Sequence, residues 1–148
     1  MWLEATMSGT VEDAMFADAL VRLSQLVQNV FGEVARRHDL TPQQIRLLCV
    51  LSEGSEGMAA LGRVLNLEKS SLSGFIDRVE RRGLVERVRD SSDRRACQVA
   101  LTERGSALAT RTHSEVVAEL GRRADLLGAS ERAVFAAAVD AMAGIPVS

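Results

Sequence analysis

The chain has 148 residues, of which 47% are hydrophobic, and it carries a formal net charge of −2 at pH 7. This length suits one domain with helical extensions and can bury a core without disulfides, while the composition excludes a disordered chain. No apolar run reaches the roughly 18 residues of a membrane-spanning helix, and the N-terminus lacks the features of a signal peptide, so we expect a cytoplasmic protein that has no membrane partner.

The N-terminal part of the chain predicts one long helix. Residues 1–9 resemble a loose lead-in, Thr10 can cap a helix, and apolar residues then recur at helical spacing to about Arg37. The apolar arc is broad, which is typical of a helix with two surfaces to cover, one against its own core and one against a partner.

Two shorter helices follow. Residues 41–44 read Thr-Pro-Gln-Gln, a strong start signal with threonine at the cap, proline at the first helical position and glutamine three residues after the cap. The helix that begins there should end near Glu53. A turn is expected at 54–57 and a short helix at about 58–65.

The next segment predicts a helix and a hairpin. An amphipathic helix should span about 68–82 and end at Gly83. A strand is expected over 84–89, because apolar and charged residues alternate there. A turn at 90–93 and a returning strand at 96–101 complete the hairpin.

The C-terminal part predicts two more helices. Thr102 can cap a helix over about 103–126, in which Gly105 is a weak point. Ser130 can cap a last helix over 131–143. The fold class is therefore mainly α with a small β hairpin.

The sequence offers little for metal, redox or catalytic chemistry. Cys49 and Cys97 are far apart and only two histidines are present, so we expect no metal and no cofactor. Cys49 fits a buried small hydrophobe, and a redox role of Cys97 has no support in the pattern. No nucleophile elbow, phosphate-binding loop or catalytic carboxylate pair is present, so an enzyme is not expected.

Charge is distributed unevenly along the chain. The segment from Arg63 to Arg104 contains ten basic and seven acidic residues, while the remainder contains eight basic and thirteen acidic residues. A basic middle with acidic flanks favours contact with nucleic acid through a few placed residues rather than through bulk charge.

The helix expected at 68–82 divides into two faces. One arc about 100° wide holds four apolar residues and predicts the buried face: Leu72, Phe75, Ile76 and Val79. The opposite face holds Ser70, Ser71, Ser73, Gly74, Asp77, Arg78 and Arg81. Hydroxyl and guanidinium groups can bond phosphates or base edges, and Gly74 removes a side chain from the approaching surface. An ordinary solvated face with an Asp77–Arg81 ion pair explains the same pattern.

The context of this helix favours DNA. A short helix, a tight turn and an amphipathic helix form a helix-turn-helix, and a charged hairpin directly after it makes the winged version. The hairpin tip presents Arg94 and Arg95, which suit a narrow minor groove. The alternative for both arginines is an ion pair with Asp90 or Asp93.

The segment SSLSGFIDRVERRGLVERV resembles the recognition helix and the start of the wing in the MarR family of bacterial transcriptional regulators. The following DSSDRRACQVALTERG is similar to the wing signature of that family, an Asp-x-Arg followed by apolar alternation and Leu-Thr-x-x-Gly. In this sequence the signature falls on Asp93, Arg95, Leu101, Thr102 and Gly105. The resemblance covers about residues 40–105.

The resemblance implies a homodimer on a pseudo-palindromic operator. Residues 10–38 and 103–146 would then form a helical dimerisation region, and residues 39–102 a winged helix-turn-helix. By family role, the DNA-binding residues would be Lys69, Ser70, Ser71, Ser73, Gly74, Arg78, Arg81, Asp93, Arg94 and Arg95. Arg95 with Arg94 would reach the minor groove, and Asp93 would orient the wing.

The sequence also departs from relatives. Gly74 often corresponds to a larger polar residue, and the cysteine and tyrosines of peroxide-sensing members are absent. Members that bind phenolic ligands hold them between the two regions, where His38 and Arg46 could meet an anionic or aromatic effector. Both residues also fit an ordinary surface.

The leading hypothesis is a DNA-binding transcriptional regulator, most often a repressor, that a small molecule releases from DNA. The alternative is a winged-helix module that binds an acidic protein partner and reads no DNA.

Overall fold

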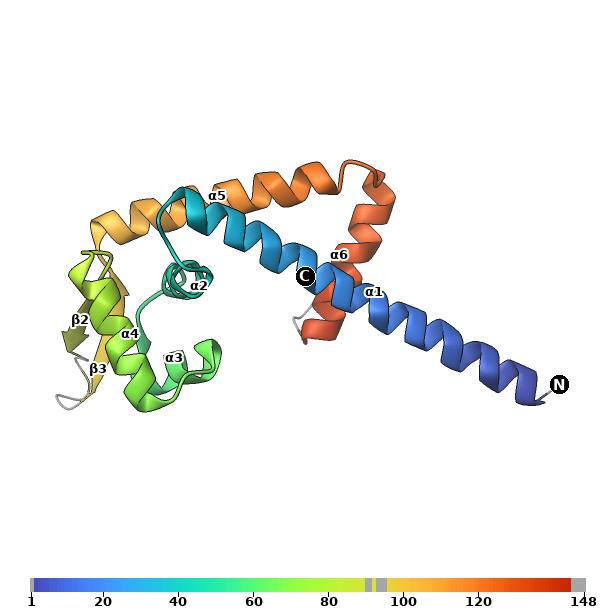
Figure 1. Ribbon diagram of the computed structural model, residues 1–148, viewed down its shortest axis with the longest axis horizontal. Coiled ribbons are helices and arrows are strands. Elements are labelled where there is room, and N and C mark those ends of the chain that lie inside the picture. Colours follow the sequence, from blue (N-terminus) through green and yellow to red (C-terminus); the bar gives the residue numbers. More distant parts are fainter. Residues whose placement is uncertain (1, 90–91, 93–95, 145–148) are drawn as a thin grey trace. The chain divides into compact units, whose positions relative to one another are not determined.

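The computed structural model describes residues 2–89, 92 and 96–144. Its elements in chain order are α1 (Trp2–Arg37), α2 (Pro42–Leu51), β1 (Glu56–Gly57), α3 (Met58–Leu65), α4 (Lys69–Arg81), β2 (Val85–Arg89), β3 (Cys97–Leu101), α5 (Glu103–Arg123) and α6 (Ala129–Ala143) (Figure 1). Helices dominate and one small antiparallel sheet is present, which confirms the predicted fold class. The chain forms two compact units, residues 1–116 and 117–148.

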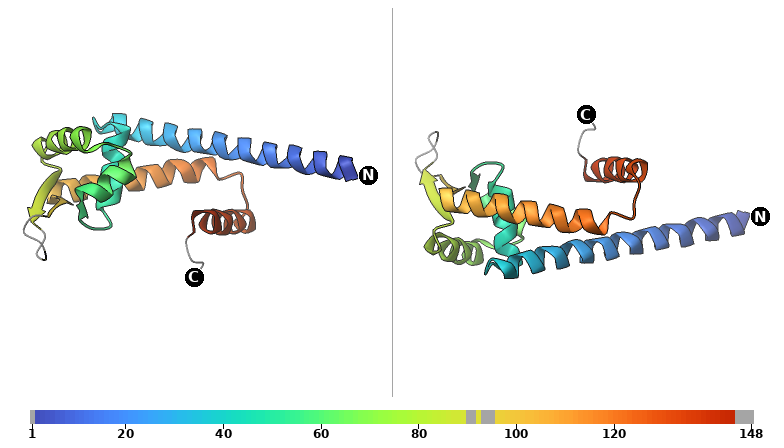
Figure 2. Two further views of the ribbon diagram at one scale, coloured as in Figure 1. Left: turned by 90° about the horizontal axis from the view of Figure 1, so that it is seen from below. Right: turned by 90° about the horizontal axis from the view of Figure 1, so that it is seen from above.

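Helix α1 begins at Trp2, eight residues before the predicted cap at Thr10. The expectation of a loose lead-in over residues 1–9 was wrong. Leucine, glutamate, alanine and methionine all occur in this stretch, and their high helix propensity carries the helix past a residue that would serve as a cap elsewhere. Helix α1 ends at Arg37, as predicted, and both views of Figure 2 show its N-terminal half extending away from α2, α3 and α4.

The start signal of α2 is confirmed in detail. The Thr41 hydroxyl accepts a hydrogen bond from the Gln44 backbone N–H at 3.1 Å, and the Gln44 side chain accepts one from the Thr41 backbone N–H at 3.0 Å. This reciprocal pair is a capping box. The helix ends at Leu51, two residues earlier than predicted, because Ser52 and Glu53 already form a turn.

The sheet contains a strand that the sequence did not predict. Residues 54–57 were expected to form only a turn, but β1 pairs antiparallel with β3, and Glu56 lies opposite Val99. The strand order is β1–β3–β2. The Ser55 hydroxyl also donates a hydrogen bond to the Gln98 side chain at 2.6 Å. A two-residue strand is too short to show a periodic pattern in the sequence, so it is recognised only by its pairing with β3.

The ends of α5 and α6 also differ slightly from the prediction. Helix α5 ends at Arg123 rather than near 126. Helix α6 begins at Ala129 with Gly128 at the cap, two residues before the expected cap at Ser130. The Glu131 carboxylate accepts the Gly128 backbone N–H at 2.8 Å, and this bond fixes the earlier start.

The core of the first unit lies between the end of α1, helices α2 to α4, the sheet and the first half of α5. Its largest fully buried side chains are Val30, Val34, Ile45, Leu47, Leu48, Leu61, Leu72, Ile76, Val79, Leu84, Val85 and Val99. This core supports α4 and the hairpin from one side, so their other sides face solvent.

Two helices each expose several large apolar side chains. On α1 these are Val11, Met15, Phe16, Val21 and Leu26, and on α6 they are Val134, Phe135, Val139 and Met142. No residue of α6 is buried. In the part of the chain that the structure describes, no helix is both long and apolar enough to cross a membrane.

Candidate nucleic-acid interface

Helix α4 has the two faces that its sequence predicted. Leu72, Phe75, Ile76 and Val79 are all buried, at most 5% exposed. The opposite face is exposed at Lys69, Ser70, Ser71, Ser73, Asp77, Arg78 and Arg81, and Gly74 is half-buried. Leucine, phenylalanine, isoleucine and valine on one arc fix which way the helix lies on the core, and so they present the serines and arginines outward.

Gly74 leaves room for a small side chain on the exposed face. A Cβ atom added there would meet only the Arg78 guanidinium, at 3.6 Å, which is ordinary van der Waals contact. The protein's own packing therefore does not require glycine at this position.

A hollow between α3 and α4 adds a residue that the sequence interpretation did not assign. Arg63 on α3 and Lys69 on α4 line it together with Met58, Leu67 and Leu72. Both cations are exposed and have no ion-pair partner among the described residues. The two cations are six residues apart, on either side of the turn between α3 and α4, and this spacing could have predicted that they lie near each other. Arg63 therefore lies beside Lys69, one of the predicted DNA contacts.

The acidic residues of α4 pair with the hairpin and not within the helix. The Arg87 Nη2 atom on β2 lies 2.7 Å from Asp77 Oδ1, and its Nη1 atom donates to Glu80 Oε2 at 3.1 Å. The alternative Asp77–Arg81 ion pair is not formed, and Arg81 Nε instead reaches the Asp77 backbone carbonyl at 3.4 Å. Sequence spacing could not predict this pairing, because Arg87 lies in a different element from Asp77 and Glu80.

The junction between α4 and the hairpin is tightly built. Gly83 has φ +72°, a left-handed conformation that glycine adopts freely, and it ends α4 as predicted. The Thr102 hydroxyl donates to the Gly83 carbonyl at 2.6 Å and accepts the Gly105 N–H at 3.0 Å, so Thr102 caps α5 as predicted. A Cβ atom at Gly105 would stand 1.9 Å from the Leu84 carbonyl oxygen. The prediction that Gly105 is a weak point of the helix was wrong, because glycine is required where α5 packs closely against the Leu84 backbone.

The hairpin pairs β2 with β3 in register from Val85 opposite Leu101 to Arg89 opposite Cys97. The predicted tip residues Asp93, Arg94 and Arg95 lie outside the described residues, as do Asp90 and Ser91. The structure therefore describes both strands of the hairpin, and β2 begins at Val85, shortly after α4 ends at Arg81.

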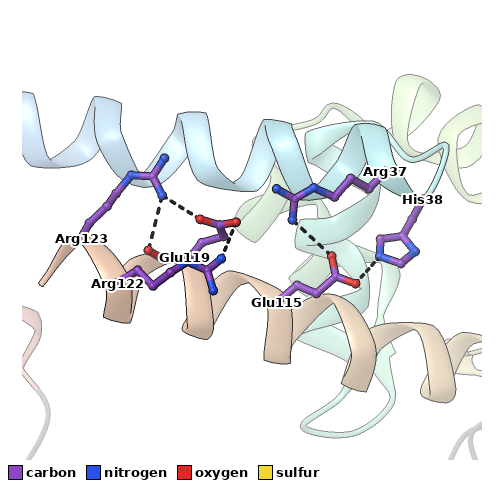
Figure 3. Close-up of polar contacts among 6 residues, drawn as sticks. All are labelled: Arg37, His38, Glu115, Glu119, Arg122 and Arg123. Carbon is purple, nitrogen blue, oxygen red and sulfur yellow. Dashed lines mark hydrogen bonds and ion pairs between the residues drawn. The ribbon is translucent and has the colours of Figure 1, made fainter. Parts of the chain in front are cut away.

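A polar cluster joins the end of α1 to α5 within the first unit (Figure 3). The Glu115 carboxylate lies 2.9 Å from His38 Nε2 and 3.6 Å from Arg37 Nη1. His38 is largely enclosed, with 14% of its side chain exposed, whereas Arg46 on α2 is exposed. The structure gives no contact that joins His38 to Arg46.

Neither cysteine is fully buried. Burial raises the pKa of the Cys49 thiol, which reduces the reactive thiolate at neutral pH. The sequence predicted a buried small hydrophobe at Cys49, but the structure leaves its side chain half-buried.

Comparison with known proteins gives a family match. A family model described as the MarR family matches residues 40–97, the part from the start of α2 into β3. The homoprotocatechuate degradative operon repressor of Escherichia coli is 32% identical over 99 residues, which cover 66% of this chain and 67% of the repressor.

Solved structures share the fold. The structure of NadR in complex with 4-hydroxyphenylacetate matches with a TM-score of 0.71 and 25% identity, over 86% of this chain and 92% of NadR. The transcriptional repressor CouR bound to a 23-mer DNA duplex matches with a TM-score of 0.69 and 28% identity, over 84% of this chain and 89% of CouR.

Proposed function

The chain belongs to the MarR family of transcriptional regulators, and on that premise we propose that it binds a pseudo-palindromic site in double-stranded DNA as a homodimer. In this role it represses transcription until a small anionic or aromatic effector lowers its affinity for DNA. The observation that carries the proposal is the division of α4 into a buried apolar face and an exposed face of serines and arginines. The protein acts in the cytoplasm and catalyses no reaction.

Helix α4 is the recognition helix in this proposal. Ser70, Ser71, Ser73 and Arg78 enter the major groove, and Lys69 and Arg81 bind phosphates. The open space at Gly74 supports a close approach to DNA. Arg95 with Arg94 reaches the adjacent minor groove, and Asp93 orients the wing. The DNA-bound structure of CouR, which has the same fold, supports this assignment.

The dimer is proposed from the apolar surface that one chain leaves uncovered. Residues 10–38 and 103–146 would form the dimerisation region, and residues 39–102 the DNA-binding region. Helices α1 and α6 both expose large apolar side chains, among them Phe16 and Phe135. A second copy of the chain can cover such surfaces and would place two recognition helices about 34 Å apart, one turn of the duplex.

His38 and Arg46 are the proposed effector residues. NadR, with the same fold, was solved with 4-hydroxyphenylacetate, a phenolic carboxylate. The His38 Nε2 atom already binds the Glu115 carboxylate at 2.9 Å, so this ring nitrogen can hold a carboxylate group. An effector carboxylate would compete with Glu115 for His38. Titration with 4-hydroxyphenylacetate should raise the melting temperature of the wild type more than that of His38→Ala, and equal shifts would remove His38 from the site.

Fluorescence anisotropy with the duplex upstream of the protein's own gene tests the DNA proposal. We expect saturable binding that weakens steeply with salt, because Lys and Arg displace counterions from phosphates. Arg78→Ala should weaken binding by about 1–3 kcal/mol, whereas Arg111→Ala, at an exposed arginine of α5, should not. Absence of binding at low salt, with an acidic protein bound at the same face, would favour the interaction module instead.

A further inference from the structure

We propose that Arg87 is a positioning residue that fixes the wing, here the paired strands β2 and β3, to α4, so that helix and strands meet DNA as one rigid unit. The inference rests on the proposed DNA-binding function. It adds a residue that acts through contacts inside the protein.

The geometry of Arg87 suits a brace. It lies in the middle of β2, opposite Val99 of β3. Its two terminal nitrogens reach two carboxylates, Asp77 at 2.7 Å and Glu80 at 3.1 Å. These carboxylates are three residues apart, so they lie about one turn apart along one side of α4. A planar fork held at two points along the helix fixes the angle between helix and strand, which a single contact would leave free to change.

The environment keeps this contact formed. The Arg87 side chain is 28% exposed, less than Asp77 at 52% or Glu80 at 42%. Burial by itself would lower the pKa of Arg87, but the hydrogen bonds and charges of Asp77 and Glu80 outweigh it and raise that pKa. The guanidinium is therefore charged at neutral pH, as the contact with two carboxylates requires.

A rigid connection matters because the two elements bind different grooves. When two contact surfaces are linked, the first contact raises the effective concentration of the second only if their geometry matches the target. A wing free to pivot against α4 would lose part of this gain. Helix α4 and strand β2 are neighbours in the chain, which brings them close together, but the contacts of Arg87 with Asp77 and Glu80 set the angle between them.

Arg87 also neutralises acidic charge near the DNA, and this effect must be separated from bracing. The double variant Asp77→Ala with Glu80→Ala separates the two effects, because they change DNA affinity in opposite directions. It removes both acceptors of the fork and makes the face more positive. Loss of acidic charge alone would tighten DNA binding, whereas loss of the brace weakens it.

The test measures operator affinity for the wild type, Arg87→Met and the Asp77→Ala, Glu80→Ala double variant, each first confirmed as folded by circular dichroism. We expect both variants to bind about tenfold more weakly than the wild type. Tighter binding of the double variant, or unchanged binding of Arg87→Met, would overturn the proposal.

A second measurement needs no DNA. Spin labels at Ser73 on α4 and Glu86 on β2, with Cys49 and Cys97 replaced by alanine, report the distance between helix and wing by double electron–electron resonance. Arg87→Met should broaden the distance distribution. The matched control Arg89→Met, on the same strand at an exposed arginine with no ion pair among the described residues, should leave it unchanged.

The two readouts separate the two proposals. If the wild type binds no DNA while Arg87→Met still broadens the distribution, the proposed function fails and the brace stands. If the distribution keeps its width, the brace is refuted whatever the DNA result.

Discussion

Gly105 lies where the first turn of α5 passes the backbone of Leu84. The 1.9 Å that would separate a Cβ atom from the Leu84 carbonyl oxygen is far shorter than any real contact. That oxygen also accepts the Thr102 N–H at 3.1 Å, so it cannot move without disturbing the start of α5. One residue thus sets how closely α5 approaches the end of α4.

Gly105→Ala should lower the free energy of unfolding by about 1–3 kcal/mol, the usual effect of overpacking a tight site. Urea denaturation measures this change. Gly121→Ala, on the same helix but with no described atom beyond that helix within 4 Å of the added Cβ, is the control and should stabilise the helix by about 0.5–1 kcal/mol. Equal effects at the two glycines would contradict the close approach.

Gly74→Ala should have opposite effects on stability and on DNA binding. The added methyl group has room in the free protein and improves helix propensity, so the free energy of unfolding should rise by about 0.5–1 kcal/mol. The same methyl group stands on the face proposed to approach DNA, so operator affinity should fall. Thermal unfolding and anisotropy measure the two effects, and unchanged affinity would place Gly74 outside the DNA contact.

At the scale of elements, α2 links the end of α1 to the end of α4 through side-chain contacts. Its capping residue Gln44 is buried and also accepts a hydrogen bond from Arg82 at the end of α4, at 3.2 Å. Arg82 in turn donates to the Asp39 carbonyl at 2.6 Å. The start of α2 and the end of α4 are therefore held by one small network.

Thr41→Ala removes the hydroxyl of the capping box and should destabilise the protein by about 1 kcal/mol. Chemical denaturation checks this value. Thr110→Ala makes the same chemical change at an exposed position inside α5, where the hydroxyl bonds only the Ser106 carbonyl, and should alter stability by less than about 0.5 kcal/mol. A loss at Thr110 as large as that at Thr41 would argue against the cap.

At the scale of the whole molecule, the exposed apolar faces of α1 and α6 are the feature that one chain cannot explain. Large exposed apolar side chains on a helix commonly mark a site where proteins associate. Stable homodimers cover it with interfaces that are richer in apolar side chains than the rest of the surface.

Phe135→Asp introduces a charge into the α6 face and should shift the protein from dimer toward monomer, with a matching loss of operator affinity. Light scattering after size-exclusion chromatography gives the mass. Val64→Asp, which makes a comparable change at an exposed valine of α3, should leave the dimer intact. A wild type that is monomeric at micromolar concentration would refute the proposed dimer.

The sequence by itself determined the features that depend on neighbouring residues. The buried face of α4, the capping box at Thr41, the end of α4 at Gly83 and the cap of α5 at Thr102 were all predicted and are confirmed. Each follows from helical spacing or from hydrogen bonds over three or four residues, and such local patterns can be recognised in the sequence alone.

Only the tertiary structure decided the features that join distant residues. It added β1 to the sheet, paired Arg87 with two carboxylates of α4 and made Gly105 a point of close packing. Several partners of opposite charge were available to each acidic residue, and spacing along the chain does not select among them. The selection is made when folding brings α4 beside the hairpin, because only then can Arg87 reach both carboxylates.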